Sequence, residues 1–415
     1  MKWRRYRIFL LVFVVLAGTA FLWMWFSLSG PMQEGVCKLR RARFPLERAG
    51  SLSVRYHRTA EAQPEMIKDI PTNLSHQARF FAIDLPQREL SGCIDQRGKA
   101  FVLYLDTNAN GLLSDEQRIQ GNRKTTRFGR EKWKYWRFGP ITLGDSSSPS
   151  NKNTRFFLLA DSLEVIQVYP VDSHIGKIRI GGKVYEVLLM DSDYDGQCRT
   201  IFSAECVQER WPDCDSIAFD YDEDGQFGHV VFHSVEEIPL PRMLKIGGQY
   251  YAVDLSENMR RLTLVKTEPE FGTVAFSTPN ITVCLLSDAF SGYINTSNGA
   301  YSLPAGHYSA YCFKARVKVE DNDWEMNSWY NTGQLKYFEI KPDQTTRLEF
   351  GPPLTAKVEV LKQAREVSLN LKLYGSGGEM YRPNIQRNGK VVKEPSFSIV
   401  DENGTVLETG RFKYG

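Results

Sequence analysis

Three short acidic segments are the residues of this chain best suited to chemistry. They read Asp106-Thr-Asn-Ala-Asn-Gly111, Asp191-Ser-Asp-Tyr-Asp-Gly196 and Asp220-Tyr-Asp-Glu-Asp-Gly225, and we name them loop one, loop two and loop three. Oxygen-bearing side chains at alternate positions can converge on one hard cation, while the glycine permits the sharp turn. Chance predicts on the order of a few hundredths of one such match. The sequence therefore predicts Ca²⁺ binding, with candidate ligands Asp106, Asn108 and Asn110 in loop one, Asp191, Asp193 and Asp195 in loop two, and Asp220, Asp222 and Asp224 in loop three.

Over this short motif, the loops resemble the calcium loops of EF-hands, dockerins and thrombospondin type 3 repeats. An EF-hand closes its cage with a bidentate Glu at loop position 12, where this chain has Gln117, Phe202 and Val231. Loop one comes nearest to the EF-hand pattern, because Ser114 stands at position 9 and Asp115 and Glu116 precede the closing position. The other two loops need acids from elsewhere, and the candidates are Asp213, Asp215, Glu236 and Glu237.

With fewer charged ligands than an EF-hand, such loops are expected to bind calcium with a Kd of about 10⁻⁴ to 10⁻³ M. Their expected role is to staple neighbouring hairpins, since a metal that binds only the folded state adds to stability. The alternative is that they are metal-free hairpin turns, because Asp and Asn tolerate left-handed conformations and make local backbone hydrogen bonds.

The elements that position these loops are expected to be β-strands. Apolar runs lead into all three loops, at 101–105, 184–190 and 217–219, and 24 Phe and 19 Tyr favour strands. Short apolar runs separated by turn residues continue along the body, which is the rhythm of hairpins. The segments 177–187 and 244–253 repeat one pattern around Gly181-Gly182 and Gly247-Gly248, and paired glycines suit tight hairpin turns.

The expected fold is mainly β and multi-domain. We expect a membrane anchor or signal peptide over 1–30, a connector over 31–60, a β-hairpin domain with the acidic loops over 61–267, a sandwich-like domain over 268–351 and a C-terminal sandwich-like unit over 352–415. The segment Tyr301-Ser-Leu-Pro-Ala-Gly-His-Tyr308 resembles the corner of transthyretin-like and carboxypeptidase-regulatory β-sandwiches. The residues Asp401-Glu-Asn-Gly404 are expected to form a hairpin turn before a final strand.

The N-terminus predicts a single membrane-spanning helix. Residues 8–28 carry no charge, and at 1.5 Å per residue they span roughly the 30 Å of a bilayer core. Lys2, Arg4, Arg5 and Arg7 precede this stretch, so the rest of the chain is expected on the extracytoplasmic side. The alternative is a cleaved signal peptide ending near Ser27 or Ser29, in which case the body is secreted.

The charge balance argues against nucleic acid as a partner. The chain has 52 Lys and Arg against 49 Asp and Glu, and setting aside the four leader cations leaves 48 against 49. A body without basic excess lacks the footprint that phosphate backbones require. The expected partners are the membrane, through the N-terminal helix, and an envelope protein or a polysaccharide.

Cysteine and histidine spacing offers weaker hypotheses. Cys284 and Cys312 flank the Pro-Ala-Gly corner and are candidates to bridge neighbouring strands, while Cys198, Cys206 and Cys214 lie between loops two and three. Unpaired, inert thiols are the alternative. His229 and His233 would face one side of a strand, where solvent exposure or hydrogen bonding is expected rather than metal binding.

No catalytic motif of the zinc-protease, serine-hydrolase, dinucleotide or phosphate-loop type occurs in the sequence. The arrangement as a whole resembles secreted or envelope proteins of bacteria to which no activity is attached. We expect a membrane-tethered, extracytoplasmic, calcium-stabilised β protein that serves a structural or binding role without catalysis. The alternative is a secreted hydrolase acting on polysaccharide or peptide, with the sandwiches as accessory modules.

Overall fold

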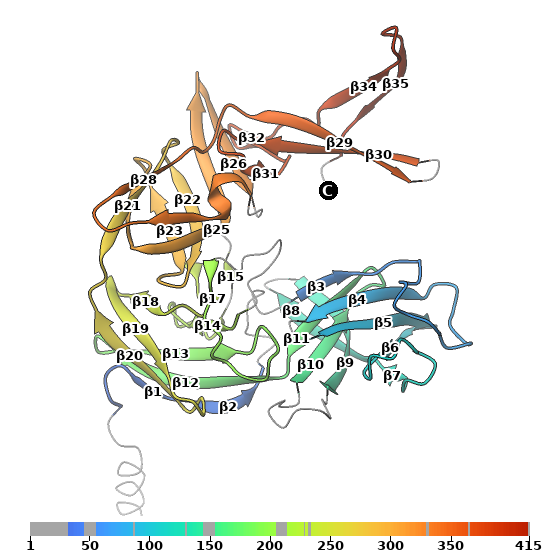
Figure 1. Ribbon diagram of the computed structural model, residues 1–415, viewed down its shortest axis with the longest axis horizontal. Helices are drawn as coiled ribbons and strands as arrows, with labels where there is room; N and C mark the ends of the chain where they lie inside the picture. Colours follow the sequence, from blue (N-terminus) through green and yellow to red (C-terminus); the bar gives the residue numbers. More distant parts are fainter. Residues whose placement is uncertain are drawn as a thin grey trace, which may run out of the picture.

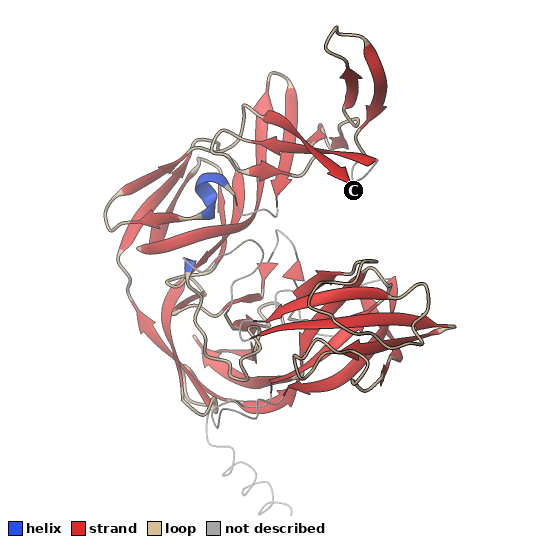
Figure 2. Cartoon of the chain, turned by 45° about the vertical axis from the view of Figure 1, so that its right-hand side comes forward, coloured by secondary structure: helices blue, strands red, loops and turns tan. Residues whose placement is uncertain are grey.

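The computed structural model describes residues 32–44, 55–85, 88–128, 131–143, 154–204, 214–227, 229–230, 234–328, 332–363 and 366–413. Within these ranges the chain is mainly β and contains no α-helix, as the strand-like composition predicts (Figure 2). None of these residues belongs to a helix long and apolar enough to cross a bilayer. The expected membrane stretch, 8–28, lies outside the described ranges.

A first sandwich is formed by two sheets. One sheet has the order β3 (Arg55–Arg58), β11 (Val165–Pro170), β10 (Thr154–Ala160), β9 (Glu131–Leu143) and β8 (Asn122–Phe128). The other has the order β4 (Arg79–Leu85), β5 (Arg88–Arg97), β6 (Ala100–Leu105) and β7 (Ile119–Gln120). Their facing side chains form one buried cluster that includes Phe81, Leu103, Phe138 and Phe156.

A second sandwich follows directly, because Val171 alone separates β11 from β12. One sheet has the order β17 (Glu237–Pro239), β14 (Ser216–Phe219), β13 (Lys183–Met190), β12 (Asp172–Ile180) and β2 (Arg40–Arg43). The other has the order β1 (Val36–Lys38), β20 (Arg261–Thr267), β19 (Gln249–Leu255) and β18 (Met243–Ile246). A small separate pair is made by β15 (His229–Val230) and β16 (Ser234–Val235).

The first two sandwiches are packed against each other. A further buried cluster lies where they meet, and it joins Phe157 and Tyr169 of the first to Leu188 and Met190 of the second. The range expected to form one domain, 61–267, therefore supplies strands to two sandwiches. The range expected to be a connector, 31–60, supplies β1, β2 and β3.

The third sandwich begins after β20. Its smaller sheet has the order β24 (Ala300–Pro304), β21 (Phe271–Phe276) and β28 (Thr345–Leu348). Its larger sheet has the order β23 (Gly292–Thr296), β22 (Ile281–Ser287), β25 (Gly306–Val319), β26 (Asn322–Ser328), β32 (Gln386–Arg387) and β33 (Lys390–Val391). The strand β27 (Phe338–Ile340) also pairs with β25, after a 3-10 turn at Gly333–Lys336. Figure 1 shows the three sandwiches following one another along an arc.

Beyond the third sandwich, the chain forms projecting hairpins (Figure 1). The strands are β29 (Thr355–Gln363), β30 (Glu366–Tyr374), β31 (Met380–Tyr381), β34 (Ser396–Val400) and β35 (Val406–Arg411). Many of their apolar side chains are exposed, among them Val358, Val406 and Leu407. The buried apolar residues described in 352–413, Tyr381 and Ile385, belong to the core of the third sandwich. Within 352–413, the expected range of a C-terminal sandwich-like unit, the described strands form hairpins, and β32 and β33 extend the larger sheet of the third sandwich.

Two hairpin predictions are confirmed. Gly181-Gly182 joins β12 to β13, and Gly247-Gly248 joins β18 to β19. The φ angles are 58° and 80° in the first turn and 58° and 83° in the second, so both turns use the left-handed region that glycine adopts without penalty. The two repeated hairpins lie in the two sheets of the second sandwich and share its core.

The predicted Pro-Ala-Gly corner also carries the chain from one sheet to the other. The strand β24 ends at Pro304, and β25 begins at Gly306 in the opposite sheet of the third sandwich. Tyr308 is fully buried, and its hydroxyl donates a hydrogen bond to the Pro304 carbonyl at 2.7 Å. The tyrosine therefore ties the start of the second strand back to the corner.

Candidate metal centres and a polar groove

All three acidic loops follow strands, as expected. Loop one comes directly after β6, loop two after β13 and loop three after β14. Since β13 and β14 are antiparallel neighbours in one sheet, loops two and three lie at opposite ends of that sheet. The three loops also share one backbone shape. Their fourth residues, Ala109, Tyr194 and Glu223, have φ of 59°, 62° and 64°, and the glycine that ends each loop has φ of 80°, 83° and 77°.

One hydrogen-bond pattern repeats in the three loops. The Oδ2 of the first residue accepts the glycine N–H at 2.8, 2.9 and 3.2 Å in loops one, two and three. The side-chain oxygen of the third residue accepts the N–H of the fifth at 3.1, 3.1 and 3.2 Å. The oxygen of the fifth residue accepts the N–H of the next residue after the glycine at 2.7, 2.6 and 2.7 Å. The alternating spacing thus turns successive side chains toward one centre.

A fourth acid joins each loop from outside the motif. Glu116, Asp215 and Glu236 accept the N–H of the second residue in loops one, two and three, at 2.6, 3.2 and 2.8 Å. Strand register places two of them. Ser216 pairs with Met190, so Asp215 lies beside Asp191, and Glu237 pairs with Ala218, so Glu236 lies near loop three. Sequence reasoning named all three among several candidate acids. Another of those candidates, Asp213, lies outside the described residues.

Loop two is the most buried of the three sites. One oxygen each of Asp191, Asp193 and Asp215 lies within 4.8 Å of the others. The Asp193 side chain is 4% exposed and that of Asp215 is 0% exposed. Burial, and then the neighbouring Asp193 and Asp195 carboxylates, raise the pKa of Asp191 well above its usual value. Burial likewise raises the pKa of Asp215, and Asp193 and Asp191 add to the shift.

Loop three gathers its acids closer to the surface. One oxygen each of Asp220, Asp222 and Asp224 lies within 4.8 Å of the others, and of these three side chains that of Asp220 is buried. Burial raises the pKa of Glu236 to about 7, partly offset by the hydrogen bond from the Tyr221 N–H. At the rim, the Lys183 ammonium lies 3.0 Å from Glu223.

Unsatisfied oxygens distinguish loops two and three from loop one. In the described part of the chain, Asp191 Oδ1 and Asp220 Oδ1 are buried and have no hydrogen-bond donor. In loop one, by contrast, both oxygens of Asp106 accept backbone N–H groups, from Asn110 and Gly111. The Asn110 amide also donates to Asp115 at 2.8 Å. Loop one therefore satisfies its first carboxylate internally.

A hard divalent cation fits loops two and three. Clustered, buried carboxylates repel one another and lose hydration, so an oxygen without a donor needs a proton or a cation. Carboxylate oxygens are the ligands that Ca²⁺ prefers, and it accepts irregular sets of six to eight of them. The residues that would hold it are Asp191, Asp193, Asp195 and Asp215 in loop two, and Asp220, Asp222, Asp224 and Glu236 in loop three.

Loop two and the segment that follows it contact the other two sandwiches. Tyr194, its fourth residue, is 2% exposed and belongs to the core of the first sandwich. Its hydroxyl donates to the Val168 carbonyl at 2.9 Å. Downstream, Thr200 N–H donates to Asp215 at 2.6 Å, and Phe202 belongs to a cluster with Cys284 and Leu286 of the third sandwich. The sequence analysis did not predict that loop two contacts another sandwich, although a tyrosine within an otherwise acidic loop could have indicated it.

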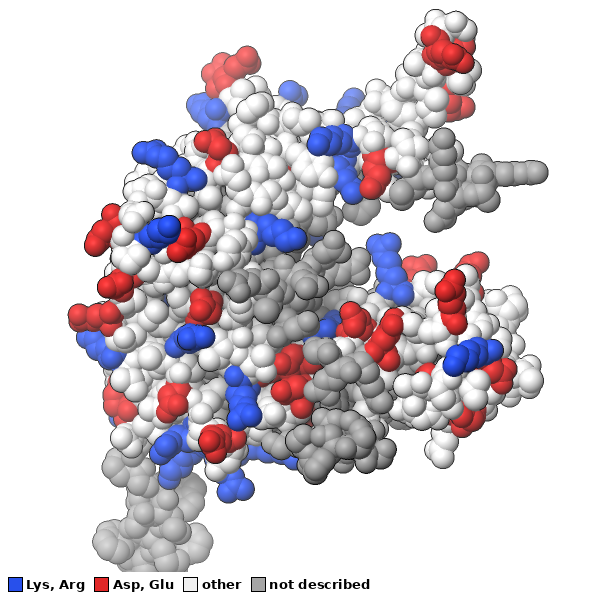
Figure 3. All heavy atoms as spheres, viewed as in Figure 1, with Lys and Arg blue, Asp and Glu red and all other residues white. Residues whose placement is uncertain are grey.

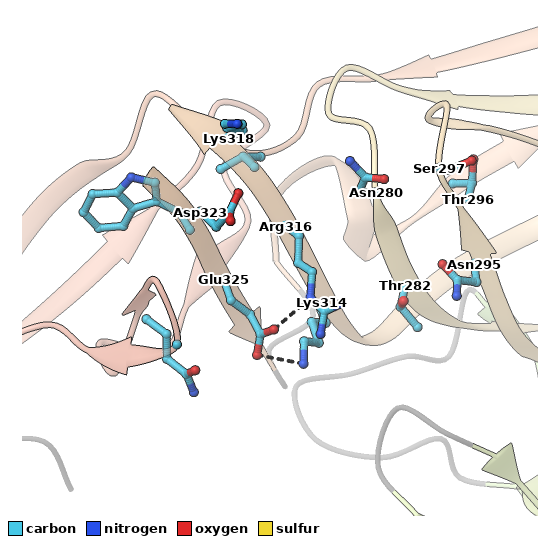
Figure 4. Close-up of a pocket in the computed structure, with 14 residues that line it drawn as sticks. Asn280, Thr282, Asn295, Thr296, Ser297, Lys314, Arg316, Lys318, Asp323 and Glu325 are labelled. Atoms are coloured by element: carbon cyan, nitrogen blue, oxygen red, sulfur yellow. Dashed lines mark hydrogen bonds and ion pairs between the residues drawn. The ribbon is translucent and has the colours of Figure 1, made fainter. Parts of the chain in front are cut away.

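A polar groove crosses the outer face of the larger sheet of the third sandwich, with a volume of about 730 Å³. Figure 4 shows amide and hydroxyl side chains along β22 and β23 and charged side chains along β25 and β26. Glu325 accepts from Lys314 at 2.7 Å and from Arg316 at 2.9 Å. Burial alone would raise the pKa of Glu325, but these two cations outweigh it and lower the pKa.

Comparison with known proteins finds no matching family model, no matching curated protein and no matching solved structure. The class of the chain is therefore defined by its own fold and sites: a β protein of consecutive sandwiches with acidic loops. The prediction for His229 and His233 stays untested, because His233 lies outside the described residues and the side chain of His229 is not described.

Proposed function

We propose that this chain is a membrane-tethered, extracytoplasmic β protein in which divalent cations, calcium foremost, hold consecutive sandwiches in a fixed arrangement. The observation that carries the proposal is the pair of buried oxygens without a donor, Asp191 Oδ1 and Asp220 Oδ1, each within a cluster of three or more acids. Loop one, whose Asp106 is satisfied by backbone N–H groups, serves as a turn.

Loop two connects calcium to the arrangement of domains. A cation at Asp191, Asp193 and Asp215 would fix the loop that inserts Tyr194 into the first sandwich. The same cation would fix the base of the segment that carries Phe202 to the third sandwich. A metal that binds only this arrangement stabilises it by mass action, by about 1.4 kcal/mol per site at ten times its Kd.

The extracytoplasmic location rests on the uncharged stretch 8–28 and the cations before it. It is consistent with the expected affinity, since sites with a Kd of about 10⁻⁴ to 10⁻³ M fill where calcium is millimolar, outside the cytoplasm. Among the described residues, the carboxyl groups whose pKa is raised are Asp191, Asp215 and Glu236, which lie in loop two or join loops two and three from outside the motif. A dication bound among these carboxylates would offset their mutual repulsion, which supports a binding role for the two clusters.

Thermal unfolding with and without calcium tests this proposal. We expect millimolar calcium to raise the Tm of chelator-treated protein, and the double substitution Asp220→Ala with Asp222→Ala to reduce the rise. The matched control is Asn108→Ala with Asn110→Ala in loop one, which should leave the calcium-dependent rise intact. A Tm that does not respond to calcium, or a response that only the loop-one variant abolishes, contradicts the proposal.

A second function, glycan binding, is favoured by the polar groove. Glu325 pairs with both Lys314 and Arg316. Together with Lys318 and Asp323, the charged side chains that line the groove sum to a net charge of only +1, so the groove does not call for a strongly charged ligand. Asn280, Thr282 and Asn295 line the groove with amide and hydroxyl groups (Figure 4). Amides and hydroxyls that both donate and accept match the hydroxyl groups of a neutral sugar chain.

Calorimetric titration with cellohexaose and chitohexaose tests the groove. We expect one of these hexasaccharides to bind, and Thr282→Ala with Asn295→Ala to weaken that binding at least about tenfold, or 1.4 kcal/mol. The matched control is Asn370→Ala, an exposed asparagine on β30 outside the groove. Absence of binding by both sugars, or binding that the groove variant leaves unchanged, contradicts glycan recognition here while leaving the calcium proposal untouched.

A further inference from the structure

Two cysteines of the third sandwich stand directly opposite each other. Cys284 on β22 and Cys312 on β25 are Cα partners in an antiparallel pair. Such partners have Cα atoms about 4.5 to 5.5 Å apart, and a disulfide needs about 4.4 to 6.8 Å. Both side chains are buried, at 2% and 0% exposure, and the two thiols are hydrogen-bonded to each other.

The two thiols have unequal acidity. The hydrogen bond to Cys312 and burial raise the pKa of Cys284. The hydrogen bond from Cys284, and then that from the Tyr293 hydroxyl at 3.3 Å, lower the pKa of Cys312 against the effect of burial. The Tyr293 hydroxyl lies 3.3 Å from Cys312 Sγ and can stabilise a thiolate there, and the thiolate is the nucleophile of thiol–disulfide exchange.

Cys37 and Cys93 contrast with this pair. Burial raises the pKa of Cys37 and of Cys93 to about 12, and each lies in a separate hydrophobic core away from Cys284 and Cys312. Cys214 is nearer, because it belongs to the cluster that covers the pair together with Phe202 and Ala204. The covering segment follows loop two, so a donor must reach the thiols before this segment closes over them.

We propose that Cys284 and Cys312 form a cross-strand disulfide as the chain folds in the presence of a disulfide donor, such as glutathione disulfide or an oxidised thiol oxidoreductase. The Cys312 thiolate attacks one sulfur of the donor and releases the first donor thiol. The Cys284 thiol then loses its proton and attacks the Cys312 sulfur of the mixed disulfide, which releases the second donor thiol. The pair loses two electrons, and the donor disulfide gains them.

The bond would link neighbouring strands of the sheet that also carries the polar groove. It closes the chain between residues 284 and 312, which contains β23, β24 and the Pro304 corner. Closing a loop of this length restricts the unfolded chain, so the oxidised protein should melt higher than the reduced protein, by about 5 to 10 °C. This inference is independent of calcium and goes beyond the proposed function.

The test is refolding of the full chain in mild detergent with glutathione disulfide, followed by alkylation under denaturing conditions and peptide mass spectrometry. The expected product is one linked peptide pair joining Cys284 to Cys312, with Cys37 and Cys93 alkylated as free thiols. Reduction should lower the Tm of the wild type and leave that of Cys284→Ala with Cys312→Ala unchanged. The matched control, Cys37→Ala with Cys93→Ala, should keep the response to reductant.

Two results overturn the inference. One is that Cys284 and Cys312 are both alkylated after refolding with the donor, because buried, adjacent thiols that stay reduced under these conditions are not a disulfide site. The other is that the linked pair contains Cys214 in place of Cys284. Both results come from the wild-type chain, so they stand even if the double variant fails to fold.

Discussion

At the scale of one residue, Asp191 is where the proposed cation in loop two would act most directly. Its Oδ2 accepts the Gly196 N–H, whereas its Oδ1 is buried among other carboxylates without a described donor. The raised pKa means that, at neutral pH and without metal, the ionised form opposes folding. A bound dication reverses this relation, because it favours the ionised form.

The effect of Asp191→Asn on the free energy of unfolding should therefore have opposite signs with and without calcium. Without calcium, we expect the variant to be more stable than the wild type by about 1 to 2 kcal/mol, because one buried charge is removed from a repelling cluster. In millimolar calcium, we expect it to be less stable, because the ion loses a carboxylate ligand. Denaturant unfolding in chelator and in calcium measures both differences.

The matched control for Asp191→Asn is Asp106→Asn in loop one. Both oxygens of Asp106 accept backbone N–H groups, so replacing one by an amide should lower stability with and without calcium. If Asp191→Asn destabilises the protein equally in both conditions, its carboxylate acts as a structural acceptor and the metal account of loop two fails.

His174 predicts a separate loss of stability in acid. Burial and the nearby Arg41 lower its pKa below 6.5, against the opposing effect of Asp172. The unfolded chain then takes up a proton more readily than the folded chain, so stability falls as pH drops below about 6.5. Unfolding of wild type and His174→Gln, with calcium present throughout, should show a smaller decline in the variant between about pH 8 and pH 5. If the stabilities of wild type and His174→Gln decline in parallel with pH, His174 is not the source of the loss of stability in acid.

At the scale of single elements, we expect alanine substitutions in the two Gly-Gly turns to lower stability by the same amount. An added Cβ at Gly182 or Gly248 meets no atom within 4 Å, so the penalty of alanine there is conformational alone. The φ angles are 80° and 83°, and each substitution should cost about 1 to 2 kcal/mol. Urea unfolding of Gly182→Ala and Gly248→Ala measures this, with exposed Gln249→Ala as the near-neutral control. Clearly unequal costs would show that the two turns are not equivalent.

Local sequence predicted these turns and the shape of the acidic loops, because glycine pairs and alternating Asp residues act through nearest neighbours. It could not select the fourth acids. Asp215 reaches loop two because β14 pairs with β13 in one register, and Glu236 reaches loop three through β17, the next strand in that sheet. Register depends on the whole sheet, so the sequence alone left several acids as equal candidates for the fourth ligand of each loop.

Other features were beyond local reasoning for the same reason. Tyr194 is a loop residue by sequence, yet it is buried in the core of a different sandwich. Loop one was expected to be closest to an EF-hand, but only the three-dimensional structure shows that backbone N–H groups satisfy both oxygens of Asp106. The alternating residues of β29 and β30 predict strands equally well whether a second sheet covers them or not.

At the scale of the whole molecule, loop two and the segment that follows it contact both the first and the third sandwich. Two hydrophobic clusters, one around Tyr194 and one around Phe202, connect this region to the first and third sandwiches. The face shown in Figure 3 carries Lys and Arg interspersed with Asp and Glu. Such a mixed surface leaves the acidic loops, the polar groove and the cysteine pair as the features that distinguish this chain.

The central claim is that loops two and three each bind calcium, and counting bound ions tests it most directly. Equilibrium dialysis of chelator-treated full chain against radioactive calcium should show about two ions per chain with a Kd near 10⁻⁴ to 10⁻³ M. Asp191→Asn with Asp193→Asn should remove one ion, and adding Asp220→Asn with Asp222→Asn should remove the other. Binding of no calcium in the millimolar range, or of the same number of ions after all four substitutions, would contradict the account.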